Sequence, residues 1–379
     1  MHSPKSEAEL AEVIAGATAP FSVQGGGTRG FSVAGEVLST RGLSGVALYE
    51  PGSLTLVAKA GTPIAEIETL LASEGQRMAF EPADLRGMLM AKGEPTIGGA
   101  FAANSSGPRR IQGGAARDYL LGVRFVDGRG QLVKNGGRVM KNVTGYDLVK
   151  LLAGSYGTLG VLSEVSLKVL PIPEAMVTLS VCVADLGLAV GAMSAALGSP
   201  YDVTGAAYDP AAGLVHIRLE GFAPSVAYRV QKLTADLSGF GAVTAQEGAE
   251  TLWRGIRDVA AFEGRAGDVW RISIKPSDAP LLAPMLQAEA LQFDWGGGLI
   301  WALCAPGLDV RASLAQAGVA GHATLLRAGE ETKAVLGRFQ PQIQPLEAIS
   351  EGLRRRFDPR GLLNPGLMCA GQTIREQMG

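Results

Sequence analysis

The chain has 379 residues, of which 47% are hydrophobic and 18% are charged. This length is comfortable for two domains, and this composition excludes an intrinsically disordered protein. The formal net charge of −2 gives no support for nucleic-acid binding, which usually needs a basic face. The 52 glycines follow no collagen period, so they indicate turns and ligand-binding loops.

The cysteines and the apolar stretches suggest a protein of a reducing compartment. Cys182, Cys304 and Cys369 are far apart in the sequence, so they predict free thiols and neither a metal nor an iron–sulphur site. Acidic residues stand where a signal peptide would need its apolar region. The most apolar stretch, 175–198, is interrupted by Asp185 and by small polar residues. We expect a cytoplasmic protein that reaches a membrane, if at all, through partners.

Hydrophobic periodicity predicts mixed helices and strands before residue 172. A capping-box pattern at Ser6 and Glu9 opens the first helix, and Thr62 is the expected cap of the second, with Pro63 as its first residue. The expected helices are 7–16, 63–74 and 146–152. The expected strands are 20–24, 46–49, 54–60, 121–126, 131–134 and 161–170.

A glycine-rich hexamer, 25–30, directly follows the expected strand 20–24. It satisfies the Gly-x-Gly-x-x-Gly fingerprint of dinucleotide-binding Rossmann folds. That fingerprint must open a helix, whereas 31–44 contains further glycines and no helical apolar stripe. The hexamer is therefore interpreted as a ligand loop between strands.

A second glycine-rich region, 92–161, contains three further loop motifs. They are Pro95-Thr96-Ile97-Gly98-Gly99, Asn104-Ser105-Ser106-Gly107-Pro108 and Gly154-Ser155-Tyr156-Gly157-Thr158-Leu159-Gly160-Val161. Glycine lets the backbone approach a ligand closely, and runs of exposed amide groups form anion-binding concavities. A ligand that carries a diphosphate fits such loops.

Together these loops resemble the flavin-binding domain of the vanillyl-alcohol-oxidase type, also called PCMH-type. They are most similar to the FAD-binding E subunits of bacterial glycolate oxidases. The resemblance is strong over 1–170 and again from Leu346. It implies an α+β fold in which a two-lobed PCMH-type FAD-binding domain, 1–172, is followed by a smaller cap domain, 173–332. A C-terminal segment, 333–379, would return to the FAD-binding domain.

Strand and helix signals alternate in the expected cap domain, which indicates an α+β unit with a mostly antiparallel sheet. The expected strands are 176–183, 214–220, 269–274, 299–303 and 324–327, and the expected helices are 186–197, 226–237 and 279–289. Pro345 opens a last helix with one apolar face, formed by Leu346, Ile349, Leu353 and Phe357.

The resemblance also implies the contacts of an FAD. Amide groups of the first loop would hold the pyrophosphate, the second and third loops would line the opposite side, and Glu81 could bond the sugar or remain solvated. The implied contact residues are Gly25, Gly26, Gly27, Thr28, Glu81, Pro95, Thr96, Gly98, Gly99, Ser105, Gly107, Gly157, Thr158, Gly160, Val161 and Asn364. Neither glycine loop carries the histidine or cysteine to which this family often tethers its flavin, so we expect non-covalent FAD.

The catalytic groups are not evident. Oxidation of a 2-hydroxy acid requires a base and favours an arginine for the carboxylate. Arg271 and Arg327, both in expected strands, are the best anion-binding candidates, although a structural role is favoured for each. His322 is the nearest match to the metal cluster of the family's substrate-oxidising subunits, but one histidine cannot form that site, so no metal is expected.

Three functions remain open at this point. The first is the FAD-binding subunit of a glycolate oxidase, working with a larger FAD-linked subunit and an iron–sulphur subunit to convert glycolate to glyoxylate. The second is a stand-alone FAD-dependent dehydrogenase of another small 2-hydroxy acid, such as D-lactate. The third is a flavin-stabilised scaffold without a redox role. The absence of an evident base favours the first or the third, and the strong glycine framework for the flavin favours the first over the third.

Overall fold

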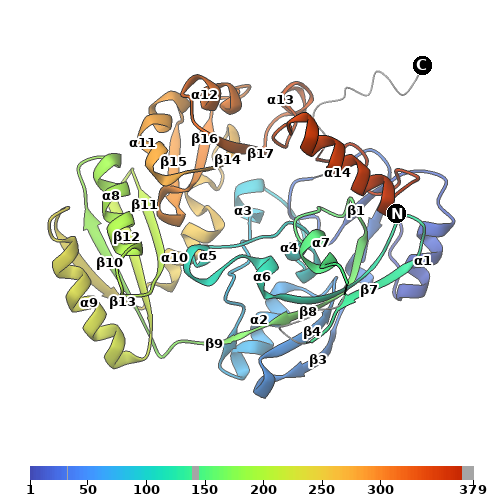
Figure 1. The fold of residues 1–379 in the computed structure, drawn as a ribbon, viewed down its shortest axis with the longest axis horizontal. Helices are drawn as coiled ribbons and strands as arrows, with labels where there is room; N and C mark the ends of the chain where they lie inside the picture. Colours follow the sequence, from blue (N-terminus) through green and yellow to red (C-terminus); the bar gives the residue numbers. More distant parts are fainter. Residues whose placement is uncertain (32, 139–144, 369–379) are drawn as a thin grey trace.

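The computed structural model describes residues 1–31, 33–138 and 145–368. Two α+β parts lie side by side in Figure 1, one around a five-stranded sheet and one around an eight-stranded sheet. The last helix, α14 (Gln344–Phe357), returns to the first part. The α+β class expected from the sequence is therefore confirmed.

The five-stranded sheet is antiparallel throughout, in the order β3-β4-β8-β6-β7. Its strands are β3 (Val46–Glu50), β4 (Thr55–Lys59), β6 (Leu120–Val126), β7 (Leu132–Gly136) and β8 (Val161–Lys168). Two further strands, β1 (Phe21–Gln24) and β2 (Glu36–Ser39), form a separate parallel pair, and β1 ends where the first glycine loop begins. Another short pair joins β5 (Gln76–Arg77) to β9 (Leu170–Pro171). The five-stranded sheet and the β1-β2 pair give this part its two lobes.

Short helices surround these sheets. They are α1 (Glu7–Ala15), α2 (Ile64–Ser73), α3 (Arg86–Leu89), α4 (Ile97–Ala102), α5 (Arg110–Gly113), α6 (Ala116–Tyr119) and α7 (Leu148–Leu152). The cap expected for α2 is wrong by one residue, because Thr62 is buried and its hydroxyl donates to the Lys59 carbonyl at 2.7 Å. Pro63 occupies the cap position instead.

The eight-stranded sheet is antiparallel as well, in the order β13-β10-β12-β11-β15-β16-β14-β17. Its strands are β10 (Ala175–Cys182), β11 (Val203–Asp209), β12 (Leu214–Gly221), β13 (Val243–Glu247), β14 (Asp268–Ile274), β15 (Ala290–Asp294), β16 (Leu299–Cys304) and β17 (Gly321–Arg327). The mostly antiparallel sheet expected here is confirmed, but the sequence missed β11, β13 and β15. Small residues in β11 and exposed residues in β13 weaken their strand signals.

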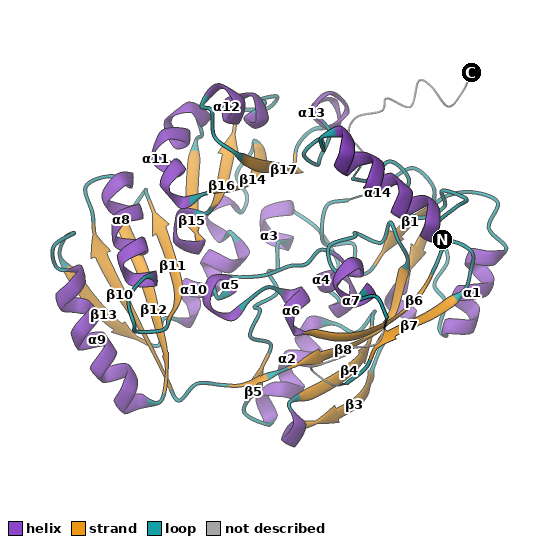
Figure 2. Cartoon of the chain, in the orientation of Figure 1, coloured by secondary structure: helices purple, strands orange, loops and turns teal. Residues whose placement is uncertain are grey.

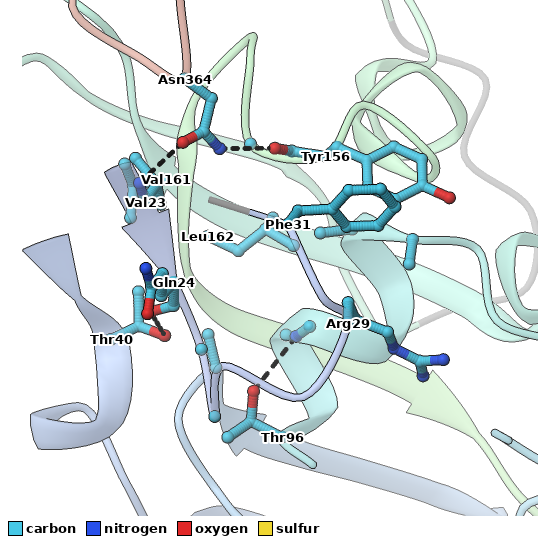
Figure 3. Close-up of a pocket in the computed structure, with 18 of the residues that line it drawn as sticks. Val23, Gln24, Arg29, Phe31, Thr40, Thr96, Tyr156, Val161, Leu162 and Asn364 are labelled. Atoms are coloured by element: carbon cyan, nitrogen blue, oxygen red, sulfur yellow. Dashed lines mark hydrogen bonds between the residues drawn. The ribbon is translucent and has the colours of Figure 1, made fainter. Parts of the chain in front are cut away.

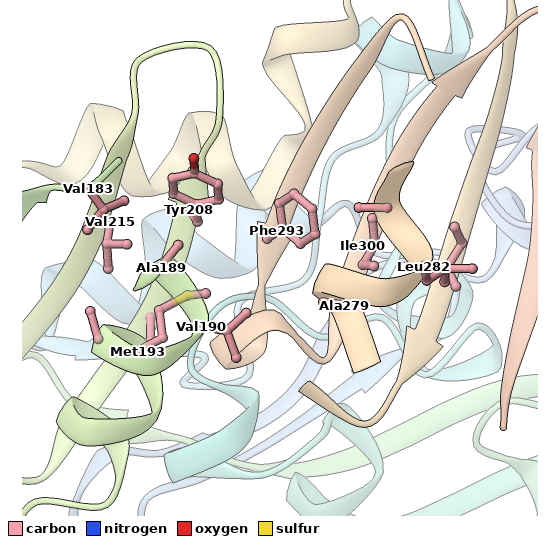
Figure 4. Packing of buried hydrophobic residues seen from close by; sticks show 14 of the residues in the cluster. Val183, Ala189, Val190, Met193, Tyr208, Val215, Ala279, Leu282, Phe293 and Ile300 are labelled. Atoms are coloured by element: carbon pink, nitrogen blue, oxygen red, sulfur yellow. The ribbon is translucent and has the colours of Figure 1, made fainter. Parts of the chain in front are cut away.

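Helices cover the outer face of this sheet, away from the first part (Figure 2). They are α8 (Leu186–Leu197), α9 (Ala223–Leu237), α11 (Ala279–Leu282) and α12 (Val310–Gln316). The core beneath them includes Met193, Phe293 and Ile300, which Figure 4 shows between helices and strands. The helix expected over 279–289 ends early, because Pro284 lacks an amide proton and only a 3₁₀ turn follows.

The inner face of the same sheet packs against the first part. Trp301 and Leu303 of β16 belong to one apolar cluster with Ala83, Leu85 and Met88 from the first part. The helix α10 (Glu250–Asp258) lies on this side, where its Trp253 is buried. Residues of β14 that face inward therefore point toward the first part.

The C-terminal segment joins the first part beside β1. The Phe21 amide donates to the Leu362 carbonyl at 2.7 Å, and the Asn364 amide donates to the Phe21 carbonyl at 3.0 Å. Beyond α13 (Glu330–Leu336), α14 packs through Leu353 and Phe357 only. The other two residues of its predicted apolar face are exposed, 52% for Leu346 and 61% for Ile349. The predicted apolar face is therefore correct for Leu353 and Phe357 and wrong for Leu346 and Ile349.

Candidate functional site

A cavity opens where the glycine loops meet (Figure 3). Its empty volume is about 930 Å³, which includes space open to solvent and lies within the range of small-molecule sites. Most of the residues implied by the resemblance line it: Gly25, Gly26, Gly27, Thr28, Pro95, Thr96, Gly98, Gly99, Gly157, Gly160, Val161 and Asn364. Loops far apart in the sequence thus form one site.

The first loop presents amide groups to this cavity. The amides of Gly25, Gly26, Gly27 and Thr28 donate no hydrogen bond to any of the described residues. Buried backbone amides are almost always paired, and successive free amides form a concavity for anions. The loop therefore fits the pyrophosphate of an FAD.

The second loop supports the first. A Cβ atom on Gly26 would lie 1.6 Å from the Glu94 carbonyl oxygen, and one on Gly25 would lie 2.3 Å from the Thr96 hydroxyl. The amides of Gly98 and Gly99 are already used, by the Ala60 carbonyl at 2.8 Å and the Thr96 hydroxyl at 3.3 Å. The second loop therefore lacks the free amides of the first.

Asn364 closes the cavity from the C-terminal segment. Its side-chain oxygen accepts a hydrogen bond from the Val23 amide at 2.7 Å, and its side-chain nitrogen donates to the Tyr156 carbonyl at 2.8 Å (Figure 3). One buried side chain thus connects β1, the third loop and the C-terminal segment.

Four of the residues implied by the resemblance do not line the cavity. Ser105 accepts from the Ala83 amide at 3.1 Å, and the Thr158 hydroxyl donates to the Ser155 carbonyl at 2.7 Å. The Gly107 carbonyl accepts from the Trp295 indole at 3.1 Å. The fourth, Glu81, belongs to a buried ionic cluster. Ser105, Gly107 and Thr158 thus belong to the glycine-rich motifs without lining the cavity.

Glu81 binds arginines of both parts of the molecule. It accepts two hydrogen bonds from Arg218 of β12, both at 3.0 Å, and pairs with Arg109 at 2.7 Å. Arg109 also donates to Glu220 of β12, and Arg77 joins the same carboxylate at 2.7 Å. Burial alone would raise the pKa of Glu81, but the charges of Arg218 and Arg109 outweigh it and hold that pKa below its usual value. The pKa of Glu220 is lowered by the same balance.

The three catalytic candidates have different environments. Arg327 donates to the carbonyls of Gly267, Met88 and Arg265, so its guanidinium is already bound within the chain. His322 is exposed at the start of β17. Arg271 of β14 is partly buried beside the Trp295 ring, 5.0 Å from its centroid, and forms no hydrogen bond or ion pair with described residues. Of the two arginines, only Arg271 lacks a hydrogen-bond partner among the described residues.

Sequence reasoning missed an aromatic group beside the cavity. The rings of Phe31, Tyr156 and Phe339 lie within 5.0–5.7 Å of one another, and Phe31 and Tyr156 line the cavity. Arg29 also lines it, directly after the first loop. In the sequence, the only indication that Arg29 lines the cavity was its position directly after Thr28, the last residue of the first loop expected to contact FAD. The pKa of Tyr156 is raised by burial, which the charges of Arg271 and Arg29 partly oppose.

The described residues contain no group of three or more histidine, cysteine or acidic side chains able to hold a metal ion. Cys182 and Cys304 are free thiols, as expected, and burial raises the pKa of Cys304 to about 12. Cys369, the third expected free thiol, lies outside the described residues. Within the same described ranges, no helix is both long and apolar enough to cross a membrane.

Comparison with known proteins agrees with this site. Residues 2–136 match the family described as FAD binding domain. The glycolate oxidase subunit GlcE of Escherichia coli (strain K12) is 37% identical over 355 residues, 93% of either chain. This chain belongs to the GlcE family. It is therefore a member of an FAD-dependent oxidoreductase family, and its cofactor is FAD.

Other relatives match a smaller share of this GlcE family member. The glycolate oxidase subunit GlcD of Bacillus subtilis (strain 168) is 34% identical over 38% of this chain and 29% of its own length. The D-lactate dehydrogenase of Anaerostipes hadrus is 42% identical over 22% of this chain and 18% of its own. A solved structure of alkyldihydroxyacetonephosphate synthase superposes with a TM-score of 0.68 over 97% of this chain and 76% of that one. Its 16% identity supports the fold alone.

Proposed function

We propose that this GlcE family member is the FAD-binding subunit of a glycolate oxidase complex, which oxidises glycolate to glyoxylate. The observation that carries the proposal is the run of four free amides, Gly25 to Thr28, at the wall of a cavity large enough for a small-molecule ligand. The strong similarity to the Escherichia coli subunit supports the choice of substrate class and complex.

The FAD would be held without a covalent bond. None of the described residues that line the cavity is a histidine or a cysteine, the usual tethering residues. The first loop would bind the pyrophosphate, while Thr96, Gly157, Val161 and Asn364 would line the other side. When bound, FAD supplies an acceptor for the hydride of a hydroxy acid. The chain's own residues that line the cavity would position it.

The partners would be a larger FAD-linked subunit, similar to GlcD, and an iron–sulphur subunit. We expect a cytoplasmic location, with any contact to a membrane made through these partners. We also propose the domain division 1–172, 173–332 and 333–379, which is supported by the two separate sheets and by the return of 362–364 to β1.

A specific observation also favours a second candidate, the stand-alone oxidation of a small 2-hydroxy acid. Arg29 lines the cavity, and neither Arg29 nor Arg271 has a hydrogen-bond acceptor among the described residues. None of the described residues that line the cavity is a histidine, aspartate or glutamate that could act as the general base, so we place the subunit role first.

The test uses the isolated chain and the assembled complex. The purified chain should carry FAD that acid precipitation releases completely into the supernatant. The complex assembled with this chain should oxidise glycolate, whereas the remaining subunits alone should not. A colourless chain, yellow pellets after acid treatment, or full activity without this chain would contradict the proposal. Anaerobic bleaching of the isolated chain's flavin by glycolate or D-lactate would favour the second candidate.

A further inference from the structure

An exposed apolar stripe runs along the first half of α14. Ile343, Leu346 and Ile349 are all exposed, and their spacing of three residues places them along one side of the helix and its cap. Although all 14 residues of α14 are described, none of them is buried. Of the 14 large hydrophobic residues that are exposed within the described ranges, four fall between residues 335 and 349. Single exposed apolar side chains are ordinary, whereas such a group marks an interaction surface.

The chain around this stripe carries few charges. Between residues 334 and 350 only Arg338 and Glu347 are charged, and the Arg338 guanidinium lies over the Phe31 ring, 5.0 Å from its centroid. Depletion of charge around exposed apolar side chains is typical of the centre of a protein–protein interface. A helix that binds lipid would instead carry basic residues along its polar face, whereas those of α14 are confined to 354–356 at its far end. The stripe therefore fits a protein partner.

The segment that leads into the stripe is held in place by the eight-stranded part. Arg311 of α12 donates to the Leu336 carbonyl at 2.5 Å and to the Arg338 carbonyl at 2.8 Å. The Leu325 amide of β17 donates to the same Arg338 carbonyl at 2.8 Å. A surface whose backbone is already ordered loses less conformational freedom when a partner binds to it.

The same segment reaches the FAD cavity. The ring centroid of Phe339 lies 5.7 Å from that of Phe31 and 5.0 Å from that of Tyr156, and both of these residues line the cavity. Ile343 follows Phe339 by four residues, so their Cα atoms are at most about 14 Å apart. A protein that docks on the stripe would therefore lie beside the FAD cavity. Because electron transfer slows steeply with distance, such a place suits a partner that exchanges electrons with the flavin.

We propose that Ile343, Leu346 and Ile349 form the docking surface for the larger FAD-linked subunit of the complex. Permanent subunits are joined through apolar contacts with few charges, whereas a diffusing electron carrier is steered to its partner by charge. The partner would present an apolar surface that is likewise poor in charges. The docking surface rests on the exposure, charge depletion and position described above, and the identity of its occupant rests on the proposed function.

The test measures binding of the purified, FAD-loaded chain to the purified larger subunit by calorimetry. Leu346→Glu and Ile349→Glu would each place an unpaired carboxylate in the interface, which should weaken binding by about 100-fold or more. Leu281→Glu on α11 is the matched control, because Leu281 is 57% exposed but lies far from α14 in Figure 1. It should bind as the wild type does. The FAD content and thermal unfolding of all three variants should match the wild type, since each replaced side chain is exposed.

The outcomes separate the docking surface from the proposed function. A wild-type chain that does not bind the larger subunit contradicts both. A wild type that binds, with Leu346→Glu and Ile349→Glu binding as tightly, overturns the docking surface and leaves the proposed function intact. A dimer of the isolated chain that Leu346→Glu dissociates would make a second copy the occupant and overturn the assignment. Binding that Leu346→Glu abolishes, but to the iron–sulphur subunit alone or to phosphatidylglycerol vesicles, would overturn it too.

Discussion

Arg218 and Glu81 form a two-pronged ion pair across the two parts of the molecule, with both nitrogen-to-oxygen distances at 3.0 Å. Arg218 is 1% exposed, and Glu81 adopts a left-handed backbone conformation, with φ of +48°, to reach it. The carboxylate considered a sugar ligand from the sequence is thus fully engaged in joining the parts.

Replacing Glu81 by Ala should therefore destabilise the protein without directly removing the flavin. Removal of one partner leaves a buried arginine charge uncompensated, which typically costs about 3–5 kcal/mol of unfolding free energy. The pKa of Glu81 in the folded protein lies below its ordinary value of 4.5. The ion pair therefore contributes its full stabilisation above pH 4.5, and this stabilisation is lost as the pH falls through the folded pKa. Urea unfolding between pH 3 and 7 measures this.

The control is Glu331→Ala, an exposed glutamate on α13, which should change stability little. A loss of FAD from Glu81→Ala at a temperature where it remains folded would restore the sugar-binding interpretation.

We predict that Asp294 makes the free energy of unfolding depend on pH in the opposite direction. Burial raises its pKa to about 7 from an ordinary 3.8, an effect that the Trp295 amide only partly offsets. The folded state therefore holds a proton that the unfolded state releases, and wild-type stability falls as pH rises from about 4 to about 7. Asp294→Asn keeps an acceptor for the Trp295 amide but never ionises. Its stability relative to the wild type should rise over that range by about 4 kcal/mol and then level off.

Thermal and urea unfolding at pH 4, 5.5, 7 and 8 check this, with the exposed Asp236→Asn as the control. A difference that stays constant with pH would show that Asp294 ionises normally.

The sequence predicted the glycine loops because their chemistry is local. A strand followed by Gly25-Gly26-Gly27 needs no distant partner to be read as a ligand loop. Glu81 could not be read in that way, because its partner Arg218 lies 137 residues further along the chain. Arg271 was proposed as an arginine in an expected strand, while Arg29 and Tyr156 line the cavity only after folding. Strands such as β11 were missed because small residues there are selected by packing and not by strand propensity.

Gly26→Ala should abolish FAD binding through the second loop. Its Cβ atom would lie 1.6 Å from the Glu94 carbonyl oxygen, so the chain before Thr96 must move and the free amides lose their arrangement. Gly52→Ala is the control, because a Cβ atom there meets nothing within 4 Å. The ratio of flavin to protein absorbance after purification measures the effect. Full FAD content in Gly26→Ala would mean that the loop tolerates the displacement and is not the pyrophosphate site.

Asn364→Asp should weaken FAD binding by at least about tenfold and lower stability by about 1–3 kcal/mol. The aspartate keeps the acceptor for the Val23 amide but places an oxygen against the Tyr156 carbonyl. Asn135→Asp is a matched control, since that side chain likewise accepts from Leu148 and donates to the Tyr146 carbonyl, but outside the cavity. Flavin fluorescence on dilution gives the affinity. Equal losses of affinity in both variants would reduce the role of Asn364 to general stability.

The last prediction separates His322 from Arg271 in the assembled complex. His322 is exposed at the start of β17 opposite Ser273, so His322→Ala should change glycolate oxidation by well under the roughly 100-fold expected on loss of a general base. Arg271→Gln removes a guanidinium that has no hydrogen-bond acceptor among the described residues, and it should instead raise KM by about 10- to 100-fold. Steady-state kinetics with stopped-flow flavin reduction measure both. A loss of several orders of magnitude in His322→Ala, with the fold preserved, would make this histidine a catalytic residue and shift the reacting centre to the start of β17.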